Sequence, residues 1–209
     1  MYSFQNNYPP FICGIDEAGR GTLCGSLFVS GVICYDREFL QDSGIKDSKK
    51  LTKDKRSKIA SLLMQNPQTF FHIAQKKANE IDSKGLSLCL RESLNEIITA
   101  LQPYSTHFIY DGNTTFGFTP PQDIQLDTLI KGDAKLLQIA AASILAKYSK
   151  DLEMQELHTR YPDYCFHQHS GYSTALHREK LKQLGPIQEH RKTFLKNLQI
   201  FQKQNHLFS

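Results

Sequence analysis

Short apolar runs separated by turn-forming residues predict five strands along the chain. Such runs, rich in Val, Ile, Leu or Phe and bounded by Gly, Pro, Asn or Asp, are typical of strands. They cover residues 11–16, 23–35, 69–74, 107–110 and 124–130. The glycine-rich turn between the first two predicts an antiparallel hairpin, and Gly25 and Gly31 predict a bulge or bend in the second strand.

Apolar residues at helical spacing predict helices between and after these strands. The predicted helices cover residues 53–65, 84–101, 136–160 and 174–184, a last one begins near Glu189, and 167–172 is expected to be a loop. The first half of the 136–160 helix is apolar on nearly every side, so we expect it to be buried. This order of elements predicts an α/β fold in which helices pack on a mixed sheet.

Length and composition indicate a soluble globular protein. A chain of 209 residues fits one domain, or one domain with an appendage. No apolar run approaches the roughly 20 residues of a membrane span, and the first ten residues lack the features of a signal peptide. We therefore expect a cytoplasmic protein. The five cysteines include no C-x-x-C pair, so they indicate neither a disulfide framework nor a zinc site.

Basic residues gather in two segments of the chain. Residues 166–209 contain seven Lys or Arg against two Asp or Glu, and residues 46–58 are also strongly basic. Two basic segments beside an acidic centre suit a polyanion held over metal-binding carboxylates. Solvated helical faces would give the same pattern.

The first predicted turn combines two acids with Gly19-Arg20-Gly21. Asp16 and Glu17 end a core strand, where holding two carboxylates together is costly unless a hard divalent cation offsets their charge. An arginine between two glycines suits a phosphate, since the backbone can approach closely. The turn therefore suggests phosphodiester chemistry, although a solvated turn with a salt bridge would also explain it.

Two further acids could join this site. Asp111 also follows an apolar strand, and ligands of open α/β sheets sit outside the carboxyl ends of strands. Asp151 lies on the stripe of the 136–160 helix that carries Ile144 and Lys147, which turns it toward the packed side. Several carboxylates from separate elements are what a two-metal site requires.

The motifs of the chain resemble, in order and spacing, those of the type 2 ribonuclease H family (ribonuclease HII). They span about residues 13–194 and read IDEAGRG, DSKKL, YDGN, KGDAK, AAASILAK-x-x-KD and HSGY-x-T…GP…HR. The resemblance implies the ribonuclease H-like fold, a five-stranded mixed sheet flanked by helices. It implies a catalytic core over residues 1–165 and a basic helical C-terminal extension over 166–209 that completes the substrate site.

The resemblance also implies the reaction. Enzymes of this family hydrolyse the RNA strand of RNA/DNA hybrids and cut 5′ of ribonucleotides embedded in duplex DNA, leaving 3′-hydroxyl and 5′-phosphate ends. By the family's pattern Asp16, Glu17, Asp111 and Asp151 are the catalytic metal ligands. Mg²⁺ or Mn²⁺ is the expected cofactor, two ions per site, because oxygen ligands suit hard ions. A monomer acting in DNA replication and repair is expected.

Substrate contacts follow from the same resemblance. Gly19, Arg20 and Gly21 match the loop that reads the ribose 2′-hydroxyl through its backbone. Tyr172 matches the tyrosine that packs on the next sugar at the RNA-to-DNA junction, and Ser48 and Lys49 match a phosphate-binding motif. Two positions depart from the pattern: Ser173 replaces a glycine, which leaves the junction preference open, and Lys150 stands where arginine is usual.

Three alternatives stay open. The chain could be a noncatalytic nucleic-acid-binding module on the same fold. A zinc site could form from four histidines, namely His167, His169, His177 and His190. A sliding-clamp contact is conceivable in residues 202–208, although their spacing fits such a motif poorly.

Overall fold

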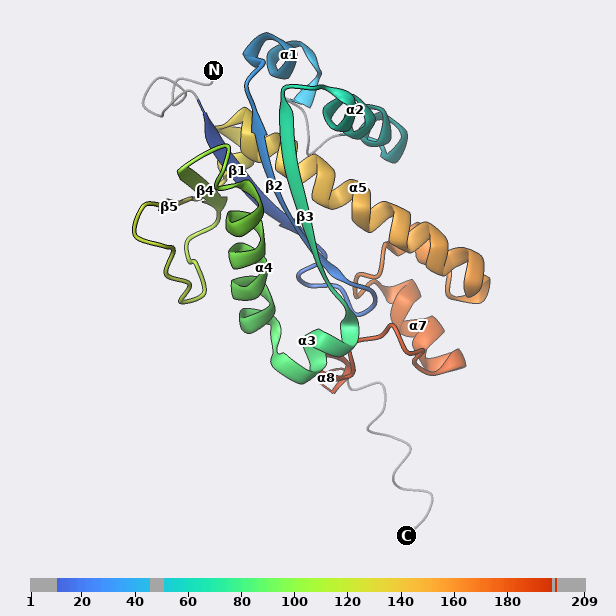
Figure 1. Ribbon diagram of the computed structural model, residues 1–209. Helices are drawn as coiled ribbons and strands as arrows, with labels where there is room; N and C mark the ends of the chain where they lie inside the picture. Colours follow the sequence, from blue (N-terminus) through green and yellow to red (C-terminus); the bar gives the residue numbers. More distant parts are fainter. Residues whose placement is uncertain (1–10, 46–50, 197, 199–209) are drawn as a thin grey trace.

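A five-stranded mixed sheet forms the centre of the molecule (Figure 1). The structure is a computed structural model that describes residues 11–45, 51–196 and 198. The strands are β1 (Ile12–Ala18), β2 (Leu27–Cys34), β3 (Thr69–Lys76), β4 (His107–Asp111) and β5 (Gln125–Leu129), in the order β3-β2-β1-β4-β5. The β1–β2 and β2–β3 pairs are antiparallel, whereas β1–β4 and β4–β5 are parallel. The predicted hairpin and mixed sheet are confirmed.

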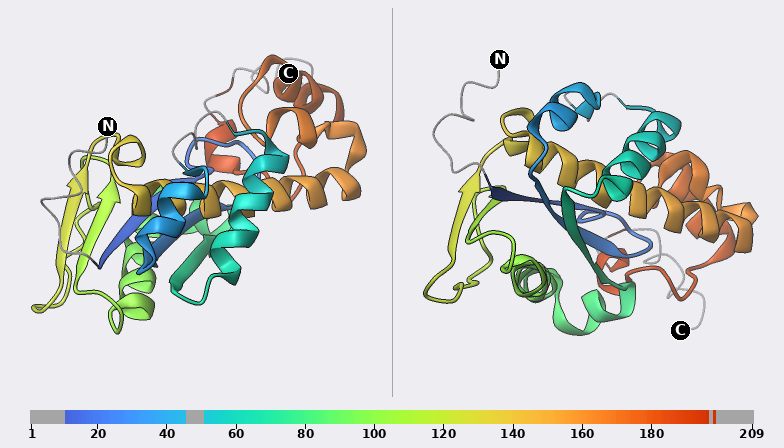
Figure 2. Two further views of the ribbon diagram at one scale, coloured as in Figure 1. Left: turned by 90° about the horizontal axis from the view of Figure 1, so that it is seen from above. Right: turned by 45° about the horizontal axis from the view of Figure 1, so that its top comes forward.

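Helices cover both faces of the sheet (Figures 1 and 2). On one face, α3 (Ala78–Lys84) and α4 (Leu86–Leu101) pack against alternate residues of the strands, including Ile15 and Val29. On the other face lie α1 (Arg37–Asp42), α2 (Lys53–Gln65) and α5 (Leu137–Arg160). The first half of α5 is buried as predicted. Each fully buried Leu, Ile or Val contributes about 1.5–3 kcal/mol to folding.

The C-terminal elements pack onto the end of α5. They are η4 (Pro162–Tyr164), α6 (Phe166–His169), α7 (Ala175–Leu184) and α8 (Lys192–Leu195). Their apolar side chains share one cluster with α5 and with the β1–β2 loop, made of Leu23, Cys24, Met154, Leu157, Tyr164, Phe166, Leu181 and Leu195. The basic C-terminal extension thus covers the loop that follows Asp16 and Glu17. The domain boundary at residue 165 stays a prediction.

The predicted second strand was too long at its start. It was expected over 23–35, but β2 begins at Leu27. Gly25 has a positive φ of 82°, and the backbone groups of the preceding loop bond to the C-terminal extension instead of to a strand. Gly31 forms no bulge: it pairs regularly with both neighbouring strands. Its lack of a side chain makes room for α4, since an added Cβ would lie 2.4 Å from Ile97 Cγ2.

Several helix predictions also needed correction. Helices α1 and α3 were not predicted, because six or seven residues are too few to show a helical period. The loop expected over 167–172 overlaps the four-residue helix α6. The last helix begins at Lys192 instead of near Glu189. No helix among the described residues is both long and apolar enough to cross a membrane.

Candidate active site

Asp16 and Asp111 lie next to each other at the carboxyl ends of two parallel strands. The β1–β4 register pairs Ile15 with Tyr110, so the following residues of the two strands are Asp16 and Asp111. Residues of a strand alternate between faces. Ile12 and Ile109, which have the same phase as these two aspartates, pack against the start of α5. Both carboxylates therefore lie on the α5 side of the sheet.

The KGD turn holds the Asp111 carboxylate in place. The Gly132 N–H donates to Oδ1 at 3.0 Å, and the Asp133 N–H donates to Oδ2 at 3.2 Å. Both donors belong to the 3₁₀ turn η3 (Gly132–Ala134) that follows β5. The YDGN and KGDAK motifs thus form one structural unit, in which the first supplies the acid and the second supplies its hydrogen-bond donors.

Asp16 is the acid with the most strongly raised pKa. Burial is the main cause, and the negative charges of Glu17 and then Asp111 raise the pKa further, to about 7. The Ser143 hydroxyl of α5 lies close enough to lower the pKa, although it makes no hydrogen bond of good geometry. Near neutral pH this site therefore carries more buried negative charge than its own donors compensate. A divalent cation would relieve that excess.

Glu17 points to the opposite face of the sheet. The Tyr110 hydroxyl donates to its Oε2 at 2.5 Å, and Arg20 Nη1 lies 3.5 Å from its Oε1. Burial raises the pKa of Glu17 and the charge of Asp111 adds to this, whereas the Tyr110 hydrogen bond and Arg20 lower it. The sequence patterns did not single out Tyr110, because a tyrosine within an apolar strand is expected to be a residue of the hydrophobic core.

Asp151 is paired with a basic residue from α2. Its Oδ2 lies 2.7 Å from Arg56 Nε, and its side chain is 17% exposed, so it does face packed structure as predicted. Among the described residues, no three Asp, Glu, His or Cys side chains converge closely enough to hold a metal ion. The structure thus brings Asp16, Glu17 and Asp111 into electrostatic contact and places Asp151 on the neighbouring helix. A four-acid metal cluster stays a prediction.

The Gly19-Arg20-Gly21 loop directly follows Glu17. The Arg20 side chain is half exposed, and its guanidinium lies 5.2 Å from the centre of the Phe116 ring. Gly21 is exposed as well, whereas Gly19 is buried. A cationic fork and an exposed glycine backbone are therefore presented within a few residues of the acids. Ser48 and Lys49, also predicted to bind substrate, lie outside the described residues.

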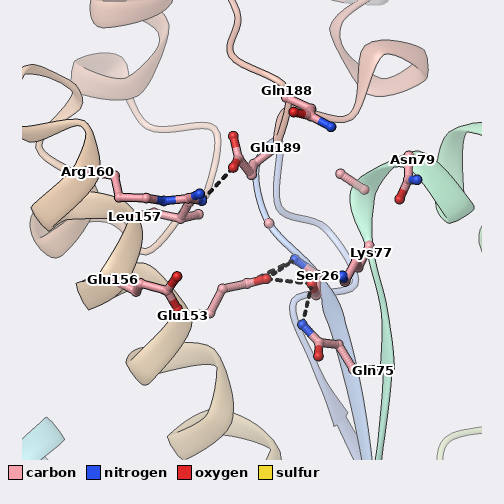
Figure 3. A pocket seen from close by; sticks show the side chains of 12 residues that line it. Ser26, Gln75, Lys77, Asn79, Glu153, Glu156, Leu157, Arg160, Gln188 and Glu189 are labelled. Atoms are coloured by element: carbon pink, nitrogen blue, oxygen red, sulfur yellow. Dashed lines mark hydrogen bonds and ion pairs between the residues drawn. The ribbon is translucent and has the colours of Figure 1, made fainter.

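Lys150 and Glu153 of α5 support the far end of this loop. The buried Lys150 ammonium donates to the carbonyls of Cys24 and Ser26 at 3.1 and 3.0 Å and pairs with Glu153 at 2.8 Å. Glu153 accepts from the Ser26 N–H and hydroxyl, as Figure 3 shows. Lys150 thus uses all three ammonium protons. In the sequence, this residue stood out only as a lysine at a position where arginine is usual in the family.

Tyr172 stands at the surface beyond the loop, with 47% of its surface exposed. Its backbone is held by three contacts: its N–H donates to the His169 carbonyl, and its carbonyl accepts from the Thr174 N–H and bonds to His177 Nδ1. An exposed ring on a fixed backbone is suited to pack on a flat partner.

Comparison with known proteins identifies the family. The family model described as Ribonuclease HII matches residues 13–198. The chain belongs to the ribonuclease HII family. A Ribonuclease HII from Helicobacter acinonychis is 45% identical over 188 residues, which cover 88% of this chain and 96% of that protein.

Solved structures agree with this family. The ribonuclease HII in a complex with PCNA from Archaeoglobus fulgidus has a TM-score of 0.77 at 28% identity, over 92% of this chain and 97% of that one. A Bst-RNase HIII crystallised with Mn²⁺ has a TM-score of 0.64 at 20% identity, covering 88% of this chain and 64% of that chain, and shares the fold. The protein is therefore an endoribonuclease of the ribonuclease H type, in a metal-dependent family that acts on RNA/DNA hybrids.

Three buried histidines form the support for Tyr172 in this ribonuclease HII. The Ile187 N–H donates to His190 Nδ1, so His190 carries its proton on Nε2 and donates to His177 Nε2 at 3.1 Å. His177 must then carry its proton on Nδ1, which donates to the Tyr172 carbonyl at 2.9 Å. His169 Nε2 bonds to the Tyr164 carbonyl. These nitrogens are engaged in hydrogen bonds, so the zinc alternative is not supported.

Acid should destabilise this histidine cluster. Burial lowers the pKa of His177 to about 4 and that of His190, with help from the neighbouring His177, to about 3. Unfolded histidines titrate near pH 6.5, so below that pH the unfolded state binds protons that the folded state does not. The contribution of the two histidines to the free energy of unfolding is fully present above pH 6.5. It decreases as the pH falls toward their pKa values in the folded state. We expect each of the two histidines to cost about 2 kcal/mol of unfolding free energy at pH 5.

Thermal unfolding of the wild type and of His190→Gln at pH 7 and pH 5 would measure this effect. Glutamine keeps a donor and an acceptor at this position but does not titrate. The decrease in Tm between the two pH values should be smaller in the variant. An equal decrease in both proteins would show that His190 does not titrate in the unfolding reaction.

Proposed function

We propose that this member of the ribonuclease HII family cuts RNA/DNA hybrids and also cuts duplex DNA 5′ of an embedded ribonucleotide, leaving 3′-hydroxyl and 5′-phosphate ends. The observation that carries the proposal is the adjacency of Asp16 and Asp111 at two parallel strand ends, with the Gly19-Arg20-Gly21 loop three residues further along the chain. Two acids that could bind a metal ion thus lie close to a loop whose backbone could contact a ribose. The substrates are RNA/DNA hybrid and ribonucleotide-containing duplex DNA, and the protein acts as a monomer in replication and repair.

The chemistry of the four acids suits divalent cations. All the donors are carboxylate oxygens, which favours Mg²⁺ or Mn²⁺. Burial, and then the negative charges of Glu17 and Asp111, raise the pKa of Asp16. Asp16, Glu17, Asp111 and Asp151 would hold the ions, the last after leaving Arg56. Bound ions would supply an activated water and stabilise the leaving 3′-oxygen. The Mn²⁺ complex of the fold relative supports a divalent metal but does not favour one of the two.

The chain's own residues would bind and orient the duplex. Backbone N–H groups of the Gly19-Arg20-Gly21 loop can approach a 2′-hydroxyl, which distinguishes RNA from DNA. The Arg20 guanidinium can hold a phosphate, and the exposed Tyr172 ring can pack on the next sugar. Ser48, Lys49 and the basic extension would add phosphate contacts. The archaeal relative in complex with PCNA makes a sliding-clamp contact a further proposal for this chain.

Cleavage assays with matched substrates test the proposed function. The wild type should cut an RNA/DNA hybrid in the presence of Mg²⁺ or Mn²⁺, and EDTA should abolish this cleavage. It should leave single-stranded RNA and all-DNA duplex intact. Binding of the hybrid without cleavage under any of these metals would instead indicate a noncatalytic nucleic-acid-binding module.

Tyr172→Ala should impair cleavage at a single embedded ribonucleotide. Removing the exposed ring takes away an apolar contact with the sugar worth about 1–3 kcal/mol, so kcat/KM should decrease roughly 5- to 150-fold. Tyr172→Phe keeps the ring face and serves as the matched control, which should stay within about threefold of the wild type. Metal dependence should be unchanged in both variants. Equal activity of the alanine and phenylalanine variants would exclude a role for the ring.

A further inference from the structure

Arg191 is the largest fully buried side chain among the described residues of this protein. It lies between α7 and α8, in the C-terminal extension, and its relative exposure is 0%. Burial is the main reason that its pKa is lowered, to about 10, so the guanidinium stays charged at neutral pH. An arginine is rarely fully buried unless its charge is compensated. The partners of this one are therefore informative.

The Arg191 guanidinium bonds to the backbone of the β1–β2 loop instead of to an acid. Nε donates to the Gly25 carbonyl at 3.0 Å, and Nη1 donates to the Arg20 carbonyl at 3.0 Å. The Arg191 backbone N–H also donates to the Leu23 carbonyl at 2.8 Å. One residue of the extension thus fixes three carbonyls of a loop that lies about 170 positions earlier in the chain.

The contact with Arg20 determines the direction of the next N–H. The peptide bond between Arg20 and Gly21 is planar and trans, so its carbonyl and its N–H point in opposite directions. Because the carbonyl points inward to Arg191, the Gly21 N–H points away from it. Gly21 is exposed, and an added Cβ would meet no atom within 4 Å. The N–H is therefore presented on the open side of the loop.

The Arg191 guanidinium also packs against the aromatic ring of Phe194. Its central carbon lies 5.2 Å from the centre of the Phe194 ring, and its charge is stabilised by Glu153. The buried Lys150 donates to the Cys24 and Ser26 carbonyls of the same loop. The loop backbone is thus fixed at both ends by cations, whereas the Arg20 and Gly21 positions stay open to solvent.

We propose that Arg191 is a positioning residue for ribose recognition, which orients the Arg20–Gly21 peptide so that the Gly21 N–H faces the substrate's 2′-hydroxyl. This inference rests on the proposed function of the Gly19-Arg20-Gly21 loop. The Arg191 side chain touches no substrate and acts only through the peptide that it holds. The extension thereby contributes to substrate specificity from the interior of the protein as well as from its basic surface.

Kinetics of Arg191→Lys and Arg191→Gln test the proposal. A mispositioned recognition group can cost about 100-fold, so kcat/KM at a single embedded ribonucleotide should decrease in the order Arg, Lys, Gln and reach that range in the glutamine variant. Lysine can still donate to one of the two carbonyls, which makes it the partial rescue. The Kd for an all-DNA duplex should change less than about twofold, because phosphate contacts carry nonspecific binding.

Arg160→Gln is the matched control. This arginine lies near the same loop but is half exposed and pairs with Glu189, as Figure 3 shows, so its loss should leave ribonucleotide cleavage at the wild-type level. Circular dichroism would establish that each variant is folded at the assay temperature. If the Arg191 variants do not fold, Phe194→Leu loosens the guanidinium without removing it and should give a smaller loss of kcat/KM in the same direction.

The outcomes separate this inference from the proposed function. If the wild type fails to cut at an embedded ribonucleotide, the proposed function is wrong. If the wild type cuts there and folded Arg191→Gln, or folded Phe194→Leu in its place, cuts equally well, the positioning role is overturned. A proportional loss of all-DNA binding and cleavage would also overturn it, because that result indicates a general structural role.

Discussion

Asp111→Asn is expected to reduce cleavage of an RNA/DNA hybrid by about 10³-fold or more, since a lost metal ligand removes several kcal/mol of transition-state stabilisation. Hybrid binding should be largely retained, because the role proposed for this acid is to hold metal and not to contact the nucleic acid. Asparagine keeps an acceptor for the Gly132 N–H but cannot accept from the Asp133 N–H as well. A small decrease in stability is therefore expected alongside the loss of activity.

Asp127→Asn is the matched control for Asp111→Asn. Asp127 lies on the next strand, opposite Ile109, and bonds to His107 and Gln125 away from the acids. This variant should cleave at nearly the wild-type rate. Metal-dependent turnover of Asp111→Asn near the wild-type rate would show that Asp111 is not a metal ligand.

Gly14→Ala is expected to destabilise the protein by about 3 kcal/mol or more, because it overpacks a rigid contact. An alanine Cβ at this position would lie 2.3 Å from the backbone of Gln138 and Ile139 in the first turn of α5. Backbone atoms cannot move aside as a flexible side chain can, so β1 and α5 must separate. At about 2–4 °C per kcal/mol for a chain of this size, Tm should decrease by roughly 6–12 °C.

Gly21→Ala provides the control for that experiment. Its added Cβ meets no atom within 4 Å, so Tm should stay within about 2 °C of the wild type. The same variant should nevertheless lose ribonucleotide cleavage, since the methyl group would stand where the proposed function places the ribose. Unchanged stability of Gly14→Ala would show that α5 does not approach β1 as closely as the structure has it.

The different roles of Gly14 and Gly21 illustrate what the sequence could and could not predict. Glycines 19 and 21 were recognisable because they flank an arginine next to two acids. Gly14 lies inside an apolar strand, and only the packing of α5 reveals why it has no side chain. Gly31 also lies inside an apolar strand and was interpreted as a bulge or bend, whereas the structure shows that it makes room for α4.

The mixed sheet was predictable from local patterns, and so was the adjacency of Asp16 and Asp111, provided that their two strands are neighbours; the order of the strands was not predicted. An apolar strand that ends in an acid and a glycine occurs twice, and parallel neighbours bring such ends together. Long-range polar contacts were not predictable in this way. Arg191 and Lys150 bond to carbonyls of a distant loop, and a carbonyl has no sequence signature. The histidines raised a zinc hypothesis because residue type does not reveal which hydrogen bonds each ring makes.

Asp151 was correctly placed on the packed side of its helix, yet its partner was not predicted. The sequence suggested convergence with the other acids, whereas the structure pairs it with Arg56 of α2. A basic residue on a separate helix has no fixed spacing from its partner. In the proposed four-acid cluster, Asp151 would have to leave Arg56 when the ions bind, so Asp151 is the most informative of the four acids to replace in metal titrations.

Mapping the cut in a DNA duplex with one embedded ribonucleotide tests the central claim most directly. With Mg²⁺ or Mn²⁺, the wild type should cut once, on the 5′ side of the ribonucleotide, and leave 3′-hydroxyl and 5′-phosphate ends. The Asp111→Asn protein should bind the same duplex and leave it intact. Cutting 3′ of the ribonucleotide, cyclic-phosphate ends, or full activity in EDTA would contradict metal-dependent hydrolysis at this site.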